Sequence, residues 1–149
     1  MGNIYGVAAP LAVPAVYVGS GNVNLIATVE TTILTSGAIV AASPGSYYPL
    51  INATIAVSLA NTLPTAMTFA FKLGAGSDVD SYAVSPNSMV LALWQLFSFT
   101  LVGVASPTAW IGAGSTINLT ALVTGTNQVA VTNFSRMVVQ LLRGPDTVA

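Results

Sequence analysis

The sequence predicts a single all-β domain, an antiparallel β-sandwich or barrel. Short apolar segments alternate with turns rich in Gly, Pro, Asn and Ser, and no segment has the apolar spacing of an amphipathic helix. The most regular segment, INATIAVSL at residues 51–59, alternates Ile, Ala, Ile, Val and Leu with Asn, Thr, Ala and Ser. That period of two is typical of an antiparallel strand with one wetter face. A chain of 149 residues suits one domain.

The N-terminal segment is predicted to be an extended arm. Pro10 and Pro14 interrupt a run of small apolar residues, which ends at the glycine-rich GSGN. An apolar segment is rarely left in water, so it either lies across a neighbouring subunit or forms a first strand and a loop. The expected boundaries are an arm at residues 1–22, a sandwich at 23–144 and a C-terminal tail at 145–149.

The strands of the sandwich are predicted from alternation and β-branched content. Turn chemistry separates them: SPGSYYP at residues 43–49, GAGSDVDS at 74–81 and SPNS at 85–88. The expected strands are residues 24–35, 36–42, 51–59, 66–73, 81–84, 116–124, 129–132 and 135–143.

The longest apolar run, SMVLALWQLFSFTLVGVA at residues 88–105, is long enough to cross a bilayer as a helix. The nearest cations, Lys72 and Arg136, lie too far from its ends to anchor an orientation. Its LFSFTL segment puts both polar residues on one face and both phenylalanines on the other. We therefore expect a long central strand, or two strands that meet near Gln95, whose second apolar face is covered by a neighbour. A membrane span is the disfavoured alternative.

Charge is scarce: only 5% of the residues are charged and the formal net charge is -1, whereas ordinary soluble domains carry about 25% charged residues. Without a basic patch, neither nucleic acid nor anionic lipid is an expected partner. The absence of Cys and His removes disulfides, the usual zinc sites and a Ser-His-Asp triad, so we expect no enzyme activity. A surface with so little charge promotes association, and much of it should be buried against copies of the chain or a partner.

Two small groups of residues are candidates for binding. Asp78 and Asp80 are the only clustered carboxylates, and in an extended loop they would point the same way and share a calcium ion. A solvated turn that uses Asp for local hydrogen bonds is the favoured alternative, and no other cofactor is expected. The aromatic residues expected at a subunit interface or in the core are Tyr47, Tyr48, Trp94 and Trp110.

One ion pair is suggested by the few charges. Glu30 is the sole acid of the first long strand, and Arg136 and Arg143 frame the last one. We expect Glu30 to pair with one of these arginines, within a subunit or between subunits, and the sequence does not choose between them.

The layout resembles a viral single jelly roll. The features that carry the resemblance are the N-terminal arm, the SPGSYYP turn, the GSDVDS loop, the WIGAGSTINLTALVTG segment and the final SRMVVQLLR strand. They are similar to those of the small β-sandwich proteins of capsids, particularly the decoration or cement proteins of tailed bacteriophages. The resemblance implies a jelly roll over about residues 24–143. It also implies a homo-oligomer, expected to be a trimer, in a virion with other capsid proteins as partners.

The leading hypothesis is thus a structural virion protein, a capsid or decoration subunit that stabilises the shell by contacts between subunits. Two alternatives remain open. The first is a carbohydrate- or receptor-binding β-sandwich whose site includes Tyr47, Tyr48, Trp110 and the loop of Asp78 and Asp80. The second is an extracellular filament subunit in which the N-terminal arm completes a neighbour's sheet.

Overall fold

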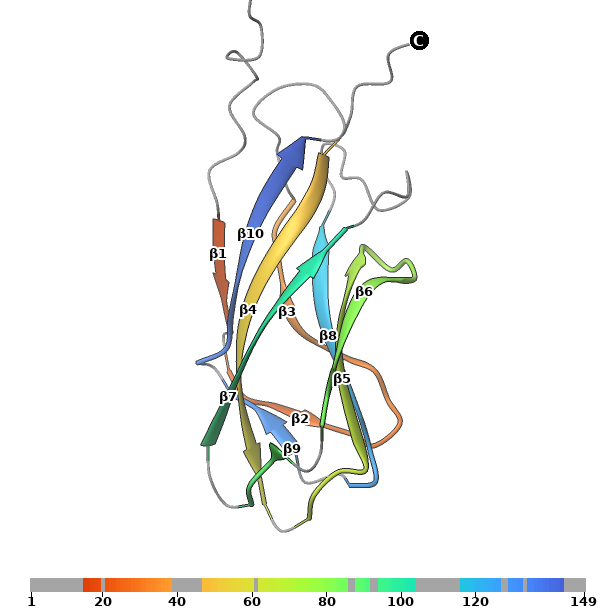
Figure 1. Ribbon diagram of the computed structural model, residues 1–149, viewed down its shortest axis with the longest axis vertical. Coiled ribbons are helices and arrows are strands. Elements are labelled where there is room, and N and C mark those ends of the chain that lie inside the picture. The colour runs from red at the N-terminus through yellow and green to blue at the C-terminus, as the bar shows by residue number, and fades with distance from the viewer. Residues whose placement is uncertain are drawn as a thin grey trace, which may run out of the picture.

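The structure, a computed structural model, describes most of the predicted sandwich. The described residues are 15–19, 21–38, 47–60, 62–85, 88–91, 94–103, 116–126, 129–132 and 134–143. Of Tyr47, Tyr48 and Arg143 only the backbone is described. These residues form two β-sheets that pack face to face, with no α-helix among them (Figure 1).

Ten strands occur in the described part of the chain. Sheet A consists of β1 (Ala15–Val18), β2 (Val23–Leu25), β4 (Tyr47–Leu59), β7 (Trp94–Val102), β9 (Val129–Val131) and β10 (Arg136–Arg143). Sheet B consists of β3 (Thr31–Thr35), β5 (Ala66–Leu73), β6 (Asp78–Val84) and β8 (Ile117–Thr124). Every pairing between neighbouring strands is antiparallel.

In sheet A, β1 and β2 are two parts of one interrupted strand, and β10 and β9 are two parts of another. The two interruptions lie side by side. β1 and β2 pair with β10 and β9 respectively, and between these pairs the Gly19 amide donates to the Ser135 carbonyl at 3.0 Å. β10 and β9 pair with the two ends of β4, whose other edge carries β7. With each interrupted strand counted once, the strand order of sheet A is β1/β2, β9/β10, β4, β7. The strand order of sheet B is β3, β8, β5, β6. This is a double-sheet jelly roll, so the predicted fold class is confirmed.

Alternation along the strands builds the core between the two sheets. The inward residues of β4, none more than 3% exposed, are Ile51, Ala53, Ile55, Val57 and Leu59. The buried residues that face them from β5 and β8 are Met67, Phe69, Phe71, Ile117, Leu119, Ala121 and Val123. The period of two predicted for residues 51–59 and 66–73 is therefore confirmed.

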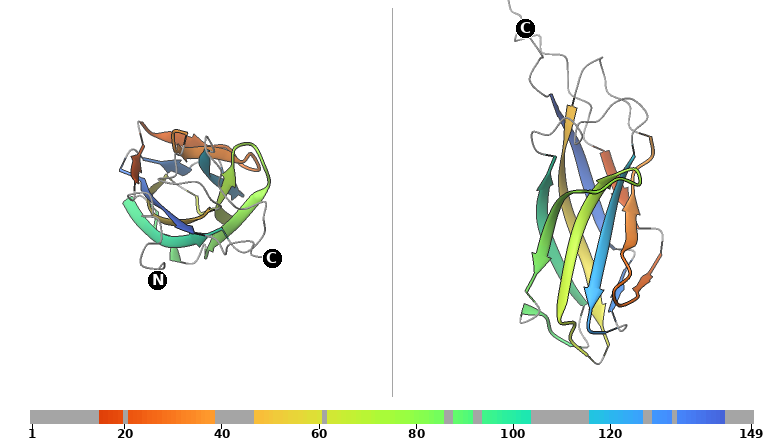
Figure 2. Two further views of the ribbon diagram at one scale, coloured as in Figure 1. Left: turned by 90° about the horizontal axis from the view of Figure 1, so that it is seen from above. Right: turned by 90° about the vertical axis from the view of Figure 1, so that its right-hand side faces the viewer.

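An aromatic ladder closes one lateral side of the sandwich, between β6 and β7. The Phe99 ring stacks on Phe69 and on Tyr82, with ring centroids 5.0 Å apart in each pair. Beside it the Asp80 carboxylate accepts hydrogen bonds from the amides of Ser81 and Val102, both at 2.9 Å. Because β6 and β7 belong to different sheets, these contacts join the sheets along one edge (Figure 2).

The apolar run at residues 88–105 contains β7, which lies at an edge of sheet A and not at its centre. β7 pairs with β4 alone among the described strands. Phe99 and Leu101 are buried, and the exposed residues between and before them are Trp94, Leu96, Ser98 and Thr100. The predicted alternation is confirmed, and the predicted central position is wrong. In the described part of the chain no helix is long and apolar enough to span a membrane.

The predicted loop at residues 74–81 is shorter than expected, because β6 already begins at Asp78. A register shift between Phe71 and Lys72 brings Asp78 opposite Lys72. Their side chains lie 3.7 Å apart, so a cross-strand ion pair extends the strand into polar sequence.

The predicted arm and two predicted strands also differ from the expectation. The strand predicted at residues 24–35 is divided into β2 in sheet A and β3 in sheet B, with a turn between them. Ala15–Val18, placed in the arm, form β1, as the first-strand alternative requires. Residues 36–38 follow β3 without forming a strand, and residues 39–42 lie outside the described residues. Residues 1–14 and the tail lie outside them as well.

The turn after β8 depends on a glycine. Gly125 has φ +92, a left-handed conformation that side chains rarely adopt. A Cβ at this position would lie 2.8 Å from the Thr65 amide nitrogen. The predicted GTNQ turn therefore needs glycine at its first position for two separate reasons.

Candidate interaction surface

The outer face of sheet A carries a cluster of exposed apolar side chains, Trp94, Leu96 and Phe134, which we call the aromatic platform. Trp94 and Leu96 lie on β7, and Phe134 lies in the turn between β9 and β10. The three residues are 59%, 68% and 70% exposed. The rings of Trp94 and Phe134 meet edge to face, with centroids 5.9 Å apart and an interplanar angle of 69°. Large apolar side chains that are exposed together mark an interaction surface more often than single ones do.

The platform spans β4 from one edge to the other. On one edge Leu96 stands opposite Ala56. On the other edge the Ala56 amide donates to Ser135 Oγ at 2.9 Å, next to Phe134. By strand alternation the Ala56 side chain belongs to the outer face, yet only 2% of Ala56 is exposed. Since the rings of Trp94 and Phe134 are in contact, we infer that they cover this part of β4 between them.

Elsewhere this outer face is mixed, since Val16 and Val18 of β1 are 58% and 66% exposed, whereas the pairs between β4 and β7 are weakly polar. Thr54 and Ser98 share a hydrogen bond of 3.2 Å between their hydroxyls, and the Thr100 hydroxyl donates to Asn52 Oδ1 at 2.8 Å. Arg136 is exposed on β10, and no described carboxylate forms a salt bridge with it. Among the side chains that the structure describes, this face therefore combines one exposed cation with a broad apolar cluster.

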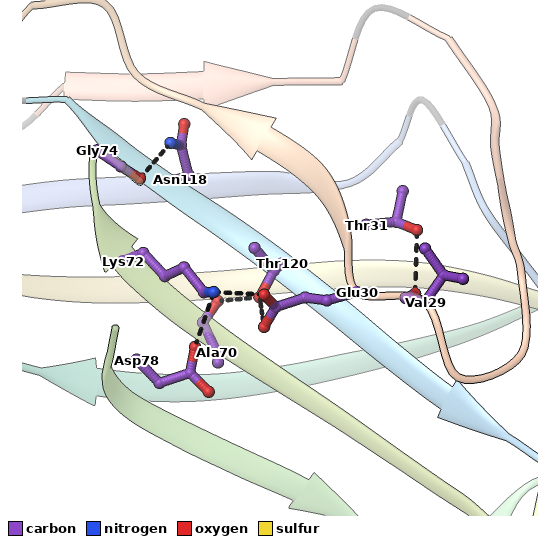
Figure 3. A network of polar contacts seen from close by, with 9 residues as sticks. All are labelled: Val29, Glu30, Thr31, Ala70, Lys72, Gly74, Asp78, Asn118 and Thr120. Atoms are coloured by element: carbon purple, nitrogen blue, oxygen red, sulfur yellow. Dashed lines mark hydrogen bonds and ion pairs between the residues drawn. The ribbon is translucent and has the colours of Figure 1, made fainter. Parts of the chain in front are cut away.

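The outer face of sheet B is organised around Lys72, whose ammonium lies between two carboxylates (Figure 3). It contacts Glu30 Oε1 and lies 3.7 Å from Asp78 Oδ1. The Thr120 hydroxyl lies 3.2 Å from Glu30 Oε2 and 3.3 Å from the Ala70 carbonyl, so it donates to one of them at a time. The pKa of Lys72 is raised, chiefly by its hydrogen bond to Glu30 and against the effect of burial.

Within the subunit Glu30 thus pairs with Lys72, and the expected intrasubunit pair with an arginine is wrong. Glu30 immediately precedes β3 of sheet B, whereas Arg136 and Arg143 both lie on β10 of sheet A. Lys72 is on β5, which shares sheet B with β3, and its side chain is on the same outer face as Glu30.

Other polar side chains on the outer face of sheet B also pair with one another. The Thr35 hydroxyl donates to Asn118 Oδ1 at 2.6 Å. Asn118 Nδ2 in turn donates to the Gly74 carbonyl at 2.8 Å. This ladder of hydrogen bonds runs across the sheet from β3 through β8 to the end of β5.

The two predicted calcium ligands make other contacts. Asp78 faces Lys72, and Asp80 accepts from the amides of Ser81 and Val102. Both aspartates lie in β6 rather than in a loop. No group of three or more His, Cys, Asp or Glu that could hold a metal occurs among the described residues. Calcium binding stays a prediction.

The structure describes the side chain of one of the four aromatic residues predicted at an interface. Trp94 is exposed and belongs to the platform. Tyr47 and Tyr48 lie in β4 with only their backbone described, and Trp110 lies outside the described residues, so their roles stay predictions. Sequence reasoning missed Phe134. A signal was available, because an aromatic residue in a short polar turn has no inward strand position to occupy.

No protein-family model matches this chain, and no curated protein matches it in sequence. Solved structures match it in fold. A chain in the structure of infectious bursal disease virus, Gx strain, has a TM-score of 0.54 and 15% identity over 92% of this chain and 34% of that chain. A chain of the VP2 subviral particle of the same virus has a TM-score of 0.52 and 16% identity over 91% of this chain and 34% of that chain.

A chain of the T13 particle of that virus also matches, with a TM-score of 0.50 and 14% identity over 85% of this chain and 31% of that chain. At these identities the likeness establishes the fold alone. This chain spans about a third of the length of the viral chains that it matches.

Proposed function

We propose that this chain is a structural virion protein, a capsid or capsid-decorating subunit that stabilises a shell through contacts between subunits. The aromatic platform carries the proposal, because its three large side chains are each more than half exposed on an outer sheet face. Apolar surface in water costs about 25 cal/mol per Å², and burial against another subunit removes that cost. The mechanism is burial of surface, with no reaction and no catalytic residue.

The fold supports this proposal by analogy. The same double-sheet jelly roll occurs in chains of infectious bursal disease virus particles. The composition is a second support, since 5% charged residues suit a surface that is buried on several sides.

In its finer form the proposal makes the working unit a homotrimer, located in the virion and bound to other capsid proteins. A cyclic trimer repeats one contact between unlike surfaces three times and then closes. A place on the outside of the shell, as a decoration protein, is the form that the sequence resemblance favours.

A single charge placed on the platform tests the proposal. Leu96→Lys puts an ammonium into the proposed contact, and Ser81→Lys puts the same charge at an exposed position on the outer face of sheet B. We expect the wild type and Ser81→Lys to form oligomers or particles in analytical ultracentrifugation and electron microscopy. Leu96→Lys should remain a monomer, because the substitution removes apolar area from the contact and the ammonium would have to lose its hydration there.

Folding of the variants serves as the control. Both positions are exposed, so each variant should unfold within about 0.5 kcal/mol of the wild type. A wild-type chain that stays monomeric and binds no particle contradicts the proposed function. If Leu96→Lys assembles at the same protein concentrations as the wild type, the platform is not part of the contact.

A further inference from the structure

A second exposed apolar site lies on the opposite side of the sandwich from the platform. It is the turn at residues 26–29 between β2 and β3, in which Ile26 and Val29 are 57% and 47% exposed. In Figure 1 the segment that joins β2 to β3 swings out to the right, whereas the start of β7 lies at the left. The right-hand view of Figure 2 also separates β7 from the β2–β3 segment. The platform and this turn therefore lie on opposite sides of the described part of one subunit.

This turn is held in a fixed shape. The Val29 amide donates to the Ile26 carbonyl at 3.1 Å, and the Thr28 amide donates to the Val123 carbonyl of β8 at 2.8 Å. Thr28 has φ 66, in the left-handed region that β-branched residues rarely adopt. A turn fixed in this way loses little conformational entropy when it binds, so it is suited to insert Ile26 and Val29 into a contact.

The charges beside the two sites are opposite. Arg136 lies two residues after Phe134 of the platform and has no salt bridge among the described residues. Glu30 follows Val29, and its cluster with Lys72 holds one more carboxylate than ammonium. Each site thus combines exposed apolar side chains with an excess of one sign of charge, and the signs are complementary.

We propose that the aromatic platform of one copy binds the β2–β3 turn of the next copy. Ile26 and Val29 pack on the platform, and Arg136 lies beside the Glu30 cluster of the neighbour. This inference rests on the proposed function, because it names the contact through which copies associate. The two surfaces differ, so the contact is heterologous and either closes into a ring or continues as an open array.

The absence of cysteine makes a direct test simple, since any cysteine introduced is the only one in its chain. Val29→Cys and Leu96→Cys proteins are mixed and treated with a short thiol-specific cross-linker. We expect a cross-linked dimer in the mixture and essentially none in either variant alone. Ser81→Cys replaces Val29→Cys in a matched control mixture, which should give no dimer.

Each outcome of this test decides the proposal. Leu96→Cys protein that cross-links to itself at the yield of the mixture shows that platform meets platform, and this overturns the proposal. No cross-link in the mixture, with a wild-type chain that still assembles, overturns the proposal and leaves the proposed function standing. A wild-type chain that does not associate overturns both.

The charge complementarity has its own test in the same mixture. Arg136→Glu in the Leu96→Cys protein should lower the yield of cross-linked dimer, and Arg136→Lys should preserve it. The loss should shrink as salt is added, because exposed charges are screened. A yield that Arg136→Glu leaves unchanged overturns the assigned orientation of the two sites.

Discussion

On the outer face of sheet B, polar side chains meet partners within the face: Lys72 lies between two carboxylates, and Asn118 lies between a hydroxyl and a carbonyl. On the outer face of sheet A, the rings of Trp94 and Phe134 meet edge to face and remain more than half exposed. Arg136, on that same face, has no salt bridge in the described part of the chain.

The difference follows from the two kinds of interaction. Hydrogen bonds and ion pairs can be completed between neighbouring strands of one sheet, so a polar face can satisfy its groups within a single subunit. Burial of apolar side chains lowers the free energy because it removes their surface from water. The outer face of a sheet in a single subunit has no further layer that could bury them. The outer face of sheet A is therefore the one on which Trp94, Leu96 and Phe134 stay exposed within a single subunit.

The largest expected loss comes from the aromatic ladder that holds the two faces in one domain. Phe99→Ala removes a ring that stacks on both Phe69 and Tyr82, and it should lower the free energy of unfolding in urea by about 3–5 kcal/mol. Tyr82→Ala is the control, and its loss should be smaller because Tyr82 is 40% exposed. Equal losses of unfolding free energy in the two variants would contradict the conclusion that the buried ring of Phe99 holds the two sheets together at this edge.

A smaller loss is expected at the polar part of the same joint. Asp80→Ala leaves the amides of Ser81 and Val102 without their acceptor, which should cost about 1–3 kcal/mol of unfolding free energy. Asp80→Asn keeps one acceptor oxygen and should lose less. Urea unfolding of both variants measures this, and an Asp80→Ala protein as stable as the wild type would show that Asp80 does not hold the edges of β6 and β7 together.

The smallest effect is expected in the charged network of sheet B. The raised pKa of Lys72 means that its contribution to stability is present at neutral pH and is lost as the pH rises through that raised pKa. Lys72→Met should therefore be slightly less stable than the wild type at neutral pH, and the difference should shrink in strongly alkaline solution. Urea unfolding across this pH range measures it. A difference that persists unchanged at the alkaline end would contradict an ionic origin.

Most strands could be predicted because alternation is a local property of the sequence. Residues 66–73 form β5 as expected, and residues 51–59 form the larger part of β4. The start of β6 was missed because Asp78 is held in a strand by Lys72 on the neighbouring strand, a contact that depends on the register shift after Phe71.

The candidate interaction surface was predicted only in part. Trp94 was expected at an interface and is exposed. Its contact with Phe134 was not foreseen, because the two residues belong to segments far apart in the sequence that lie on opposite edges of β4. The pairing of Glu30 with Lys72 rather than with an arginine also depends on which strands share a sheet.

By itself the sequence determined that this protein is an all-β sandwich or barrel with little charge and no histidine or cysteine, because composition and period-two alternation are properties of a few residues at a time. Only the tertiary structure decided which outer face carries the exposed aromatic rings and which one satisfies its own polar groups. That outcome depends on strand order: β7 lies against β4, and the turn that contains Phe134 lies against the opposite edge of the same strand. Strand order is set by packing across the whole domain, and no short stretch of sequence contains it.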